Sequence, residues 1–265
     1  MSNEKDALSA EEHARIFRER ILEESAFSTA TSQERPRVII LAGQPGAGKG
    51  GLARSAELEL RGDAVTVDPD ALRDFHPKVE SLRNAHPYTW ADDTHPDASA
   101  WAKELRSAAV EGRKNLILDT TLADGDKAVA LVKDLQAKGY EVEIRAMATH
   151  RLESELGVDE RFSNSLERKG FGRYVPEGIR DQVYRDLPDN LNQVAKETGT
   201  PVRIFNREGA ELYNSRTDTR LPGAALEEAR DARLKDAGIT RDLRDGWREQ
   251  QTWHRDLPEN LANNS

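Results

Sequence analysis

A glycine-rich segment that ends in a lysine is the clearest chemical signal in this sequence. Residues 43–50 read Gly-Gln-Pro-Gly-Ala-Gly-Lys-Gly, which matches the phosphate-loop pattern G-x-x-x-x-G-K. The glycines let backbone N–H groups surround phosphate oxygens, and the lysine places a cation beside the outer phosphates. We expect a nucleotide-binding loop made of Gly43, Gln44, Pro45, Gly46, Ala47, Gly48, Lys49, Gly50 and Gly51.

One position departs from the usual phosphate-loop pattern. A Ser or Thr normally follows the lysine and gives its hydroxyl to magnesium, but this chain has Gly50. Another group must therefore hold the ion. The alternative to nucleotide binding is a glycine-rich turn between a strand and a helix that binds no ligand.

Two aspartates follow the second apolar run of the chain. Asp68 and Asp70 come directly after residues 64–67, on the same sheet edge as the glycine-rich loop if both strands are parallel. Phosphoryl transfer to an alcohol needs a carboxylate that orients the hydroxyl or accepts its proton, so both are candidates. The alternative is structural, because Asp70 could cap a helix that begins near Ala71.

A third acid ends another apolar run. Leu116-Ile117-Leu118-Asp119 resembles the Walker B pattern, in which an acid at the end of a strand faces magnesium or substrate. Thr120 and Thr121 add two hydroxyls at the same edge. Mg²⁺ would then lie near Asp70 or Asp119, unless the latter only accepts bonds from loop amides.

Two arginines are placed where a closing lid is expected. Arg161 belongs to a helical stretch and Arg173 to a glycine-rich loop, and a guanidinium there would neutralise charge on the transferred phosphate. The alternative for each is a solvated surface charge. Among the histidines, which lack metal-ligand spacing, His76 is close enough to Asp70 in sequence to contact a substrate.

Strands and helices must alternate to bring these residues to one edge. The expected strands are 38–41, 64–67, 116–118, 142–148 and 202–205, and the expected helices are 52–61, 98–111, 125–138, 152–168 and 176–196, the last interrupted at 187–188. This alternation predicts a three-layer α/β protein with a mainly parallel sheet. With the glycine-rich loop after its first strand, the expected architecture is a three-layer P-loop kinase fold.

Helical segments flank this core on both sides. A capping box at Ser9 to Glu12 predicts a helix to about residue 24, and a polar loop follows to Pro36. After residue 215 the chain becomes rich in Leu, Ala, Arg, Asp and Glu, which predicts helix over about 222–253. We expect a kinase domain at 1–215, which includes the N-terminal helix and loop at 1–36, and a helical C-terminal extension at 216–265.

Composition narrows the possible functions. The 265 residues carry a formal net charge of −9, which disfavours long nucleic acids as partners. The absence of cysteine excludes disulfides, thiolate metal sites and cysteine nucleophiles. No run approaches the ~20 apolar residues of a membrane span. The expected location is the cytoplasm, either of the producing cell or of a cell that receives the protein, with no membrane association.

Five sequence blocks in the same order resemble the zeta-toxin family of bacterial toxin–antitoxin kinases, over about Ser9 to Tyr213. The blocks are Gly-Gln-Pro-Gly-Ala-Gly-Lys at 43–49, Asp-Pro-Asp-Ala-Leu-Arg with His-Pro at 68–77, Gly-Val-Asp-Glu-Arg-Phe at 157–162, Asp-Leu-Pro-Asp-Asn-Leu at 186–191, and Phe-Asn-Arg-Glu-Gly-Ala-Glu-Leu-Tyr at 205–213.

The resemblance implies a kinase that uses ATP or GTP with Mg²⁺. Its acceptor would be the 3′-hydroxyl of the amino sugar in UDP-N-acetylglucosamine or a related UDP-sugar, and the reaction would block cell-wall synthesis. Carried over by position, Lys49 would bind the nucleotide phosphates, Asp70 would act as the base, and Arg161 and Arg173 would steady the phosphates. A small helical antitoxin or immunity protein is the implied partner.

The same resemblance implies that Asp119 and Thr121 contact the sugar. Asp119 stands where the family commonly has Glu, which bears on sugar selectivity, and Glu104 is the candidate for an acid expected on the helix upstream. The expected substrate contacts are Asp68, His76, Glu104, Asp119, Thr120 and Thr121.

Three other functions remain open from the sequence. A related branch of this fold resembles NAD 3′-kinases, and the substrate pocket is where the branches diverge. Gly50 leaves room for a nucleotide-gated binding module without turnover. A polynucleotide kinase is disfavoured by the acidic net charge.

Overall fold

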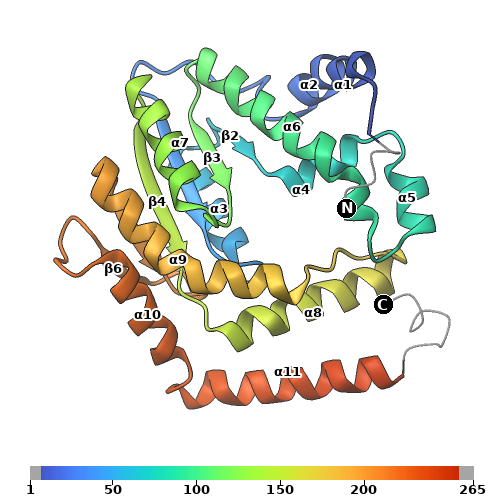
Figure 1. Cartoon of the computed structure of the whole chain (residues 1–265), viewed down its shortest axis with the longest axis vertical. Coiled ribbons are helices and arrows are strands. Elements are labelled where there is room, and N and C mark those ends of the chain that lie inside the picture. The colour runs from blue at the N-terminus through green and yellow to red at the C-terminus, as the bar shows by residue number, and fades with distance from the viewer. Residues whose placement is uncertain (1–6, 257–265) are drawn as a thin grey trace.

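A six-stranded sheet forms the centre of the molecule in a computed structural model that describes residues 7–256 (Figure 1). The strand order is β2-β3-β1-β4-β5-β6; β1 to β5 are parallel and only β6 is antiparallel. The strands are β1 (Arg37–Ala42), β2 (Val65–Val67), β3 (Leu116–Asp119), β4 (Glu141–Met147), β5 (Val202–Phe205) and β6 (Glu211–Asn214). The predicted α/β class and mainly parallel sheet are confirmed, whereas β6 was not predicted.

Helices cover both faces of this sheet. Alternate residues of β1 face opposite sides of the sheet. Val38 and Ile40 belong to the core beneath α6 (Trp90–Glu111), α7 (Gly125–Ala137) and α9 (Glu177–Thr198). Ile39 and Leu41 belong to a second core beneath α3 (Lys49–Glu59). Both faces of β1 are therefore buried, which explains why its sequence is a continuous apolar run.

Two helices differ from the prediction because of prolines inside them. α6 starts at Trp90, eight residues before the predicted start at 98, and contains Pro96; α9 continues through Pro188, where an interruption was predicted. Burial explains both cases, since α6 buries Trp90 and Ala91 in its first turn and α9 buries Leu187 together with Pro188. Tertiary contacts thus outweigh the local cost of proline in a helix.

The segment after β2 also begins earlier than predicted. Asp68 is the N-cap of α4 (Pro69–Leu72), because its Oδ1 accepts a hydrogen bond of 2.8 Å from the Asp70 backbone N–H. Asp70, for which capping was the structural alternative, lies in the first turn instead. A 3₁₀ turn (Arg73–Phe75) and α5 (Val79–Ala85) follow.

The terminal regions are helical as predicted. The N-terminal segment runs from α1 (Ala10–Ile16) through a π-helical turn (Phe17–Ile21) to α2 (Leu22–Glu24). The C-terminal region contains α10 (Pro222–Arg233) and α11 (Ala237–Arg255), and α11 lies along α8 (Arg151–Lys169) in Figure 1. Residues 257–265 of the predicted extension lie outside the described residues.

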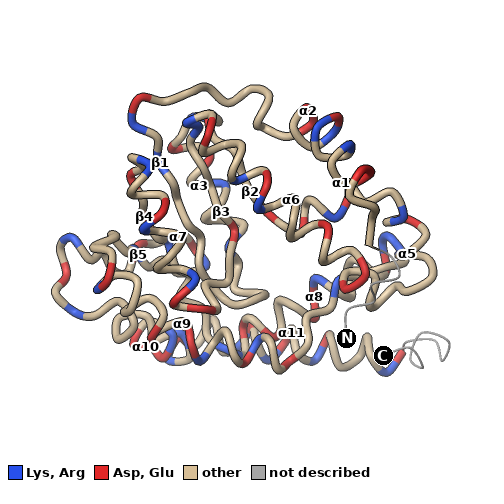
Figure 2. The backbone as a smooth tube through the Cα atoms, turned by 45° about the horizontal axis from the view of Figure 1, so that its top comes forward, with Lys and Arg blue, Asp and Glu red and all other residues tan. Residues whose placement is uncertain are grey.

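Charged residues of both signs are interspersed along the chain (Figure 2). Acidic and basic positions follow one another on the surface helices, so the net charge of −9 is not concentrated in one helix. Among residues 7–256, none of the helices combines the length and the apolar character that crossing a membrane requires.

Candidate active site

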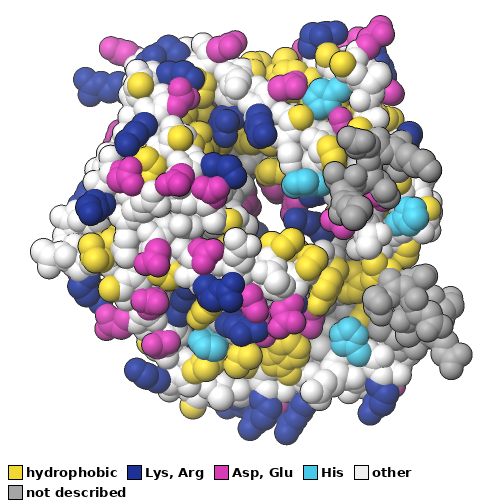
Figure 3. Space-filling model, viewed as in Figure 1, with side chains coloured by type: hydrophobic (Ala, Val, Ile, Leu, Met, Phe, Trp, Pro, Cys, Tyr) yellow, Lys and Arg dark blue, Asp and Glu magenta, His cyan; other side chains and the backbone are white. Residues whose placement is uncertain are grey.

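A cleft of about 800 Å³ opens at the carboxyl edge of the parallel strands. The space-filling view shows a hollow near the middle of this face with acidic and basic side chains around it (Figure 3). Five cationic side chains and four carboxylates line the cleft, although the whole chain is acidic. The lining residues are Gln44, Pro45, Gly46, Ala47, Gly48, Lys49, Gly50, Asp68, Pro69, Asp70, Arg73, His95, Asp119, Thr120, Thr121, Gly157, Glu160, Arg161, Asn164, Arg173 and Arg207.

The phosphate loop connects β1 to α3 and contributes one wall of this cleft. Gly46 and Gly48 have φ of 79° and 95°, in the left-handed region that favours glycine. Gly48 is the N-cap of α3 and offers no side chain to the first N–H groups of the helix. These donors and the positive end of the helix dipole suit a phosphate group.

Two glycines allow the loop to touch α8. A Cβ on Gly46 would lie 2.0 Å from the Ser154 carbonyl oxygen, and a Cβ on Gly157 would lie 2.8 Å from the Gly46 carbonyl oxygen. Any side chain at either position would push the two backbones apart. This close approach brings Arg161, one turn further along α8, to the phosphate end of the cleft.

The loop is also held by buried side-chain hydrogen bonds. The Gln44 side chain is 1% exposed, and its Nε2 donates to the Thr149 carbonyl at 2.9 Å and to the Ser154 hydroxyl at 3.2 Å. The Thr149 hydroxyl in turn donates to the Ala47 carbonyl at 2.7 Å. These contacts fix the loop to the end of β4 and the start of α8.

Lys49 links the loop to the strand-end acid of β3. Its Nζ donates to the Gly43 carbonyl at 3.0 Å and lies 3.2 Å from Asp119 Oδ1. The ammonium therefore lies between the loop and the Walker B-like position. A phosphate bound in the loop would therefore lie beside the Lys49 ammonium.

Asp70 lies between two arginines. Arg73 Nε is 3.3 Å from Asp70 Oδ1, and Arg173 forms an ion pair with the other carboxylate oxygen. The Arg173 loop is anchored, because Trp90 Nε1 donates to the neighbouring Gly172 carbonyl at 3.0 Å. The carboxylate is thus oriented at the cleft, 37% exposed, and accessible to a substrate.

Burial disfavours the charged forms of both the acidic and the basic side chains in this cleft. Burial raises the pKa of the Asp68 carboxyl, although Lys49 and Arg173 lower it. Burial also raises the pKa of Asp119, where Lys49 acts against it and the neighbouring Asp68 carboxylate adds to it. In the same way, burial lowers the pKa of the Arg161 and Arg173 guanidinium groups. An anion that brought its own negative charge would favour the charged arginines.

The Thr120 hydroxyl after β3 is held in place by a strained turn. Leu122 has φ of 53°, which is unusual for a residue other than glycine, and its N–H donates to the Thr120 hydroxyl at 2.8 Å. Asn190 of α9 donates to the Leu122 carbonyl at 2.8 Å. Thr120 and Thr121 therefore line the cleft beside Asp119, as expected.

Two predicted substrate contacts lie elsewhere. The His76 ring is buried, with its Nε2 3.6 Å from Asp97 on α6. Glu104 accepts from His13 Nε2 at 3.0 Å and so belongs to the docking of α1 on α6. Neither lines the cleft, because His76 faces Asp97 on α6 and Glu104 faces His13 on α1. Gly43 and Gly51 also stay outside the lining, although the Gly43 carbonyl contacts Lys49.

Sequence reasoning missed five polar side chains of the cleft, besides Pro69 and Gly157. Arg73 and Arg207 were inside quoted blocks but had no assigned role, and Glu160 adjoins Arg161. His95 lies in the part of α6 that was not predicted to be helical; its Nδ1 accepts from Arg73 Nη2 at 3.2 Å. The missed residues are Arg73, His95, Glu160, Asn164 and Arg207.

The carboxylates fit Mg²⁺ only in company with a ligand. Among residues 7–256, no three His, Asp or Glu side chains are grouped so that they could hold a metal ion alone. Mg²⁺ commonly uses one or two carboxylates together with waters and substrate phosphates. Asp68 and Asp119 both line the cleft beside the phosphate loop, so they suit this mode of binding.

The family is established by the sequence match. The model of the zeta toxin family matches residues 19–218. The chain belongs to the zeta toxin family. It is 30% identical over 199 residues to Toxin zeta of Streptococcus pyogenes, covering 74% of this chain and 69% of that protein. The family resemblance seen in the sequence is therefore confirmed, and zeta toxins are P-loop kinases.

Solved structures agree with the fold of this zeta toxin family member. A structure of the PezAT chromosomal toxin–antitoxin system of Streptococcus pneumoniae aligns with a TM-score of 0.81 at 22% identity, covering 93% of this chain and 99% of that one. A structure of AvrRxo1-ORF1:-ORF2 with ATP aligns with a TM-score of 0.53 at 17% identity, covering 76% and 66% of the two chains.

Proposed function

We propose that this zeta toxin family member transfers the γ-phosphoryl group of ATP or GTP to the 3′-hydroxyl of the amino sugar of UDP-N-acetylglucosamine or a related UDP-sugar. The observation that carries the proposal is the meeting of Lys49 and Asp70 in one cleft, with Arg161 and Arg173 beside them. A phosphate cradle and a carboxylate that faces an acceptor are the parts that phosphoryl transfer to an alcohol requires.

The roles follow from what each group touches. The phosphate loop and the start of α3 would hold the β- and γ-phosphates, and Lys49 would leave Asp119 to bridge them. Arg161 and Arg173 would face the charge that develops on the transferred group. Arg173 would exchange its ion pair with Asp70 for the phosphate, which frees the carboxylate to accept the proton of the attacking hydroxyl.

Magnesium, when bound with the nucleotide, neutralises phosphate charge. Asp119 and Asp68 would provide its protein ligands, since Gly50 has no hydroxyl to offer. Thr120 and Thr121, together with Asp119 at the edge of β3, would contact the sugar. The AvrRxo1 structure contains ATP, which supports ATP as a donor in this fold.

The family supports a wider biological role. We propose that the chain acts in the cytoplasm as a toxin that depletes a cell-wall precursor, and that a helical antitoxin or immunity protein restrains it. The PezAT structure comes from a toxin–antitoxin system, which supports such a partner.

Product analysis tests this proposal. The full chain is incubated with ATP and Mg²⁺ together with UDP-N-acetylglucosamine, NAD, or a 5′-hydroxyl oligonucleotide, and the products are analysed by mass spectrometry. The expected result is a gain of one phosphate on the UDP-sugar only, abolished by Lys49→Met. Phosphorylated NAD would replace the proposed acceptor, and nucleotide binding without transfer to any acceptor would indicate a binding module and refute the kinase.

A further inference from the structure

Two buried arginines of α10 reach the nucleotide end of the cleft. Arg230 is 2% exposed and Arg233 is 7% exposed, although both lie beyond the residues that match the zeta toxin family model. Arg230 Nη2 donates to Gln44 Oε1 in the phosphate loop at 3.1 Å. The C-terminal region thus touches the loop directly.

Arg230 occupies a place that the proline in α9 creates. Pro188 has no N–H, so the carbonyl of Tyr184, four residues earlier, cannot accept the usual helical hydrogen bond from it. Arg230 Nη1 donates to this carbonyl at 2.9 Å, and the guanidinium lies 3.9 Å from the centre of the Tyr184 ring. The side chain is held on the α9 side, so its second nitrogen is aimed at the loop.

This contact gives each polar atom of the Gln44 amide a hydrogen-bond partner. Its Nε2 donates to Thr149 and Ser154, and its Oε1 accepts from Arg230. Burial lowers the pKa of Arg230 to about 10, so the guanidinium is still charged at neutral pH. Without Arg230 the buried Gln44 Oε1 would lose its charged donor. An unpaired buried oxygen is costly, so the Gln44 side chain would rotate towards another donor and release the loop.

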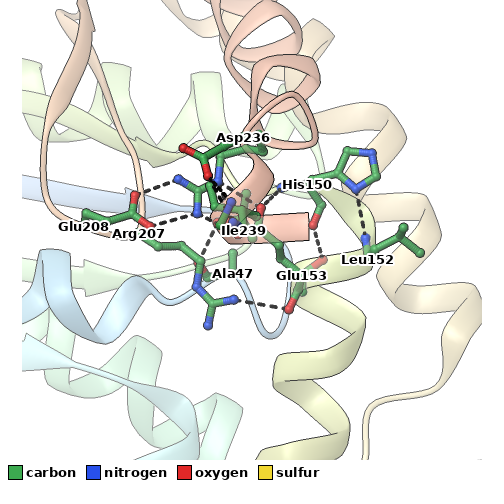
Figure 4. A network of polar contacts seen from close by, with 12 residues as sticks. Ala47, His150, Leu152, Glu153, Arg207, Glu208, Asp236 and Ile239 are labelled. Atoms are coloured by element: carbon green, nitrogen blue, oxygen red, sulfur yellow. Dashed lines mark hydrogen bonds and ion pairs between the residues drawn. The ribbon is translucent and has the colours of Figure 1, made fainter. Parts of the chain in front are cut away.

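Arg233 links the start of α8 to the β5–β6 loop, next to the phosphate loop. It forms paired hydrogen bonds with Glu153 at 2.6 and 3.0 Å and with Glu208 at 2.6 and 2.9 Å. Glu153 belongs to the capping box of α8, and Glu208 follows Arg207 in the β5–β6 loop. Figure 4 shows Glu153, Arg207 and Glu208 gathered beside Ala47 of the phosphate loop.

We propose that Arg230 is a positioning residue for nucleotide binding, which fixes the phosphate loop through Gln44, and that α10 is therefore part of the nucleotide site. Arg233 supports the same end by holding α8 and the β5–β6 loop together. This inference rests on the proposed nucleotide binding at the loop. It gives the segment after residue 218 a role in the strength of ATP binding.

Calorimetry with the full chain measures this role. Arg230→Met removes the donor and keeps the length of the side chain, and we expect it to raise the Kd for ATP with Mg²⁺ about tenfold, the effect of one charge-assisted hydrogen bond. In steady-state kinetics with the identified acceptor, Arg230→Met should raise the KM for ATP. The KM for the acceptor and kcat should each change by less than about twofold. Arg230→Lys, which retains a charged donor, restores at least part of the affinity.

A second buried arginine provides the matched control. Arg145 is also 2% exposed, but it pairs with Glu143 and Glu59 and does not line the cleft. Arg145→Met is expected to lower the melting temperature and to leave the Kd for ATP unchanged. If Arg230→Met only destabilised the fold and did not displace the loop, it would behave like Arg145→Met, with a lower melting temperature and an unchanged Kd for ATP. That result would contradict the proposal.

A double-mutant cycle decides whether Arg230 acts through Gln44. In a Gln44→Met background, Arg230→Met should change the Kd for ATP by less than about twofold, because the shared contact is already lost. An undiminished effect in that background, or an affinity of Arg230→Met equal to wild type in the first place, would overturn the inference. An Arg230→Lys variant that bound ATP no better than Arg230→Met would also count against it. A wild-type chain that bound no nucleotide would refute the proposed function itself, and the inference with it.

Discussion

The contact between the phosphate loop and α8 gives a sharp prediction for Gly46→Ala. The new Cβ would lie 2.0 Å from the Ser154 carbonyl oxygen and 2.9 Å from Val158 Cγ2, at a backbone φ of 79°. Non-bonded heavy atoms need about 3.5 Å, so the loop and the helix must separate by roughly 1 Å or more. The left-handed backbone adds about 1–2 kcal/mol of strain.

Such a displacement removes the geometry that phosphate binding requires. A misplacement of about 1 Å costs up to roughly 100-fold in rate, so we expect kcat/KM for ATP to fall by that order and the Kd for ATP to rise at least about tenfold. Calorimetry with ATP and Mg²⁺ gives the Kd without knowledge of the acceptor. Thermal unfolding of the free protein gives the change in melting temperature.

Gly62 separates backbone strain from steric clash. It also has a left-handed φ, of 71°, but nothing lies within 4 Å of its Cβ position, and it does not line the cleft. Gly62→Ala should therefore lower stability by about 1 kcal/mol of strain and leave the Kd for ATP unchanged. If Gly46→Ala bound ATP as tightly as Gly62→Ala, the close approach of loop and α8 would not matter for the site.

Four further substitutions probe the remaining parts of the cleft. Asp70→Asn should lower kcat on the order of 100-fold or more with an unchanged Kd for ATP, measured by single-turnover transfer; retained turnover would exclude Asp70 as the base. Asp68→Asn keeps the cap acceptor but removes a buried charge whose pKa burial raises above its ordinary value of 3.8, so the variant should melt above wild type at pH 7. That difference should shrink as pH falls through the raised pKa, because folded wild type then also becomes neutral; a gap that widened would contradict the assignment. Arg207→Met should weaken ATP binding up to about tenfold at low ionic strength and less at high salt, and a salt-independent effect would exclude a charge contact. Gly50→Ser adds a hydroxyl where nothing lies within 4 Å, so ATP should bind at lower Mg²⁺ concentration, and an unchanged requirement would place the ion elsewhere.

The edge rule for parallel sheets explains what the sequence predicted well. Lys49, Asp70 and Asp119 follow three different apolar runs, and parallel strands bring such ends to one edge. Their meeting needed no knowledge of distances. The helix positions of Arg161 and the loop position of Arg173 followed from spacing in the same way.

Residues fixed by long-range contacts escaped this reasoning. His95 lies in the cleft only because α6 continues through Pro96, and that continuation depends on the burial of Trp90. Arg230 is 46 residues from the Tyr184 carbonyl that holds it. A helical pattern shows which face of α10 is buried. It does not show that this face meets the Tyr184 carbonyl, which Pro188 deprives of its usual donor.

The charges of the cleft show why the free site favours a ligand. Burial raises the pKa of Asp68 and Asp119 and lowers the pKa of Arg161 and Arg173, so the folded chain holds both signs against their preference for water. Ion pairs such as that of Asp70 with Arg173 compensate part of this cost without bringing in further charge. The proposed nucleotide with its cation would compensate both sets at once, because the phosphates would neutralise the arginines and the cation would neutralise the carboxylates. Binding energy that relieves this opposition also stabilises the fold, which makes the melting temperature of the full chain a direct reporter of the occupied site.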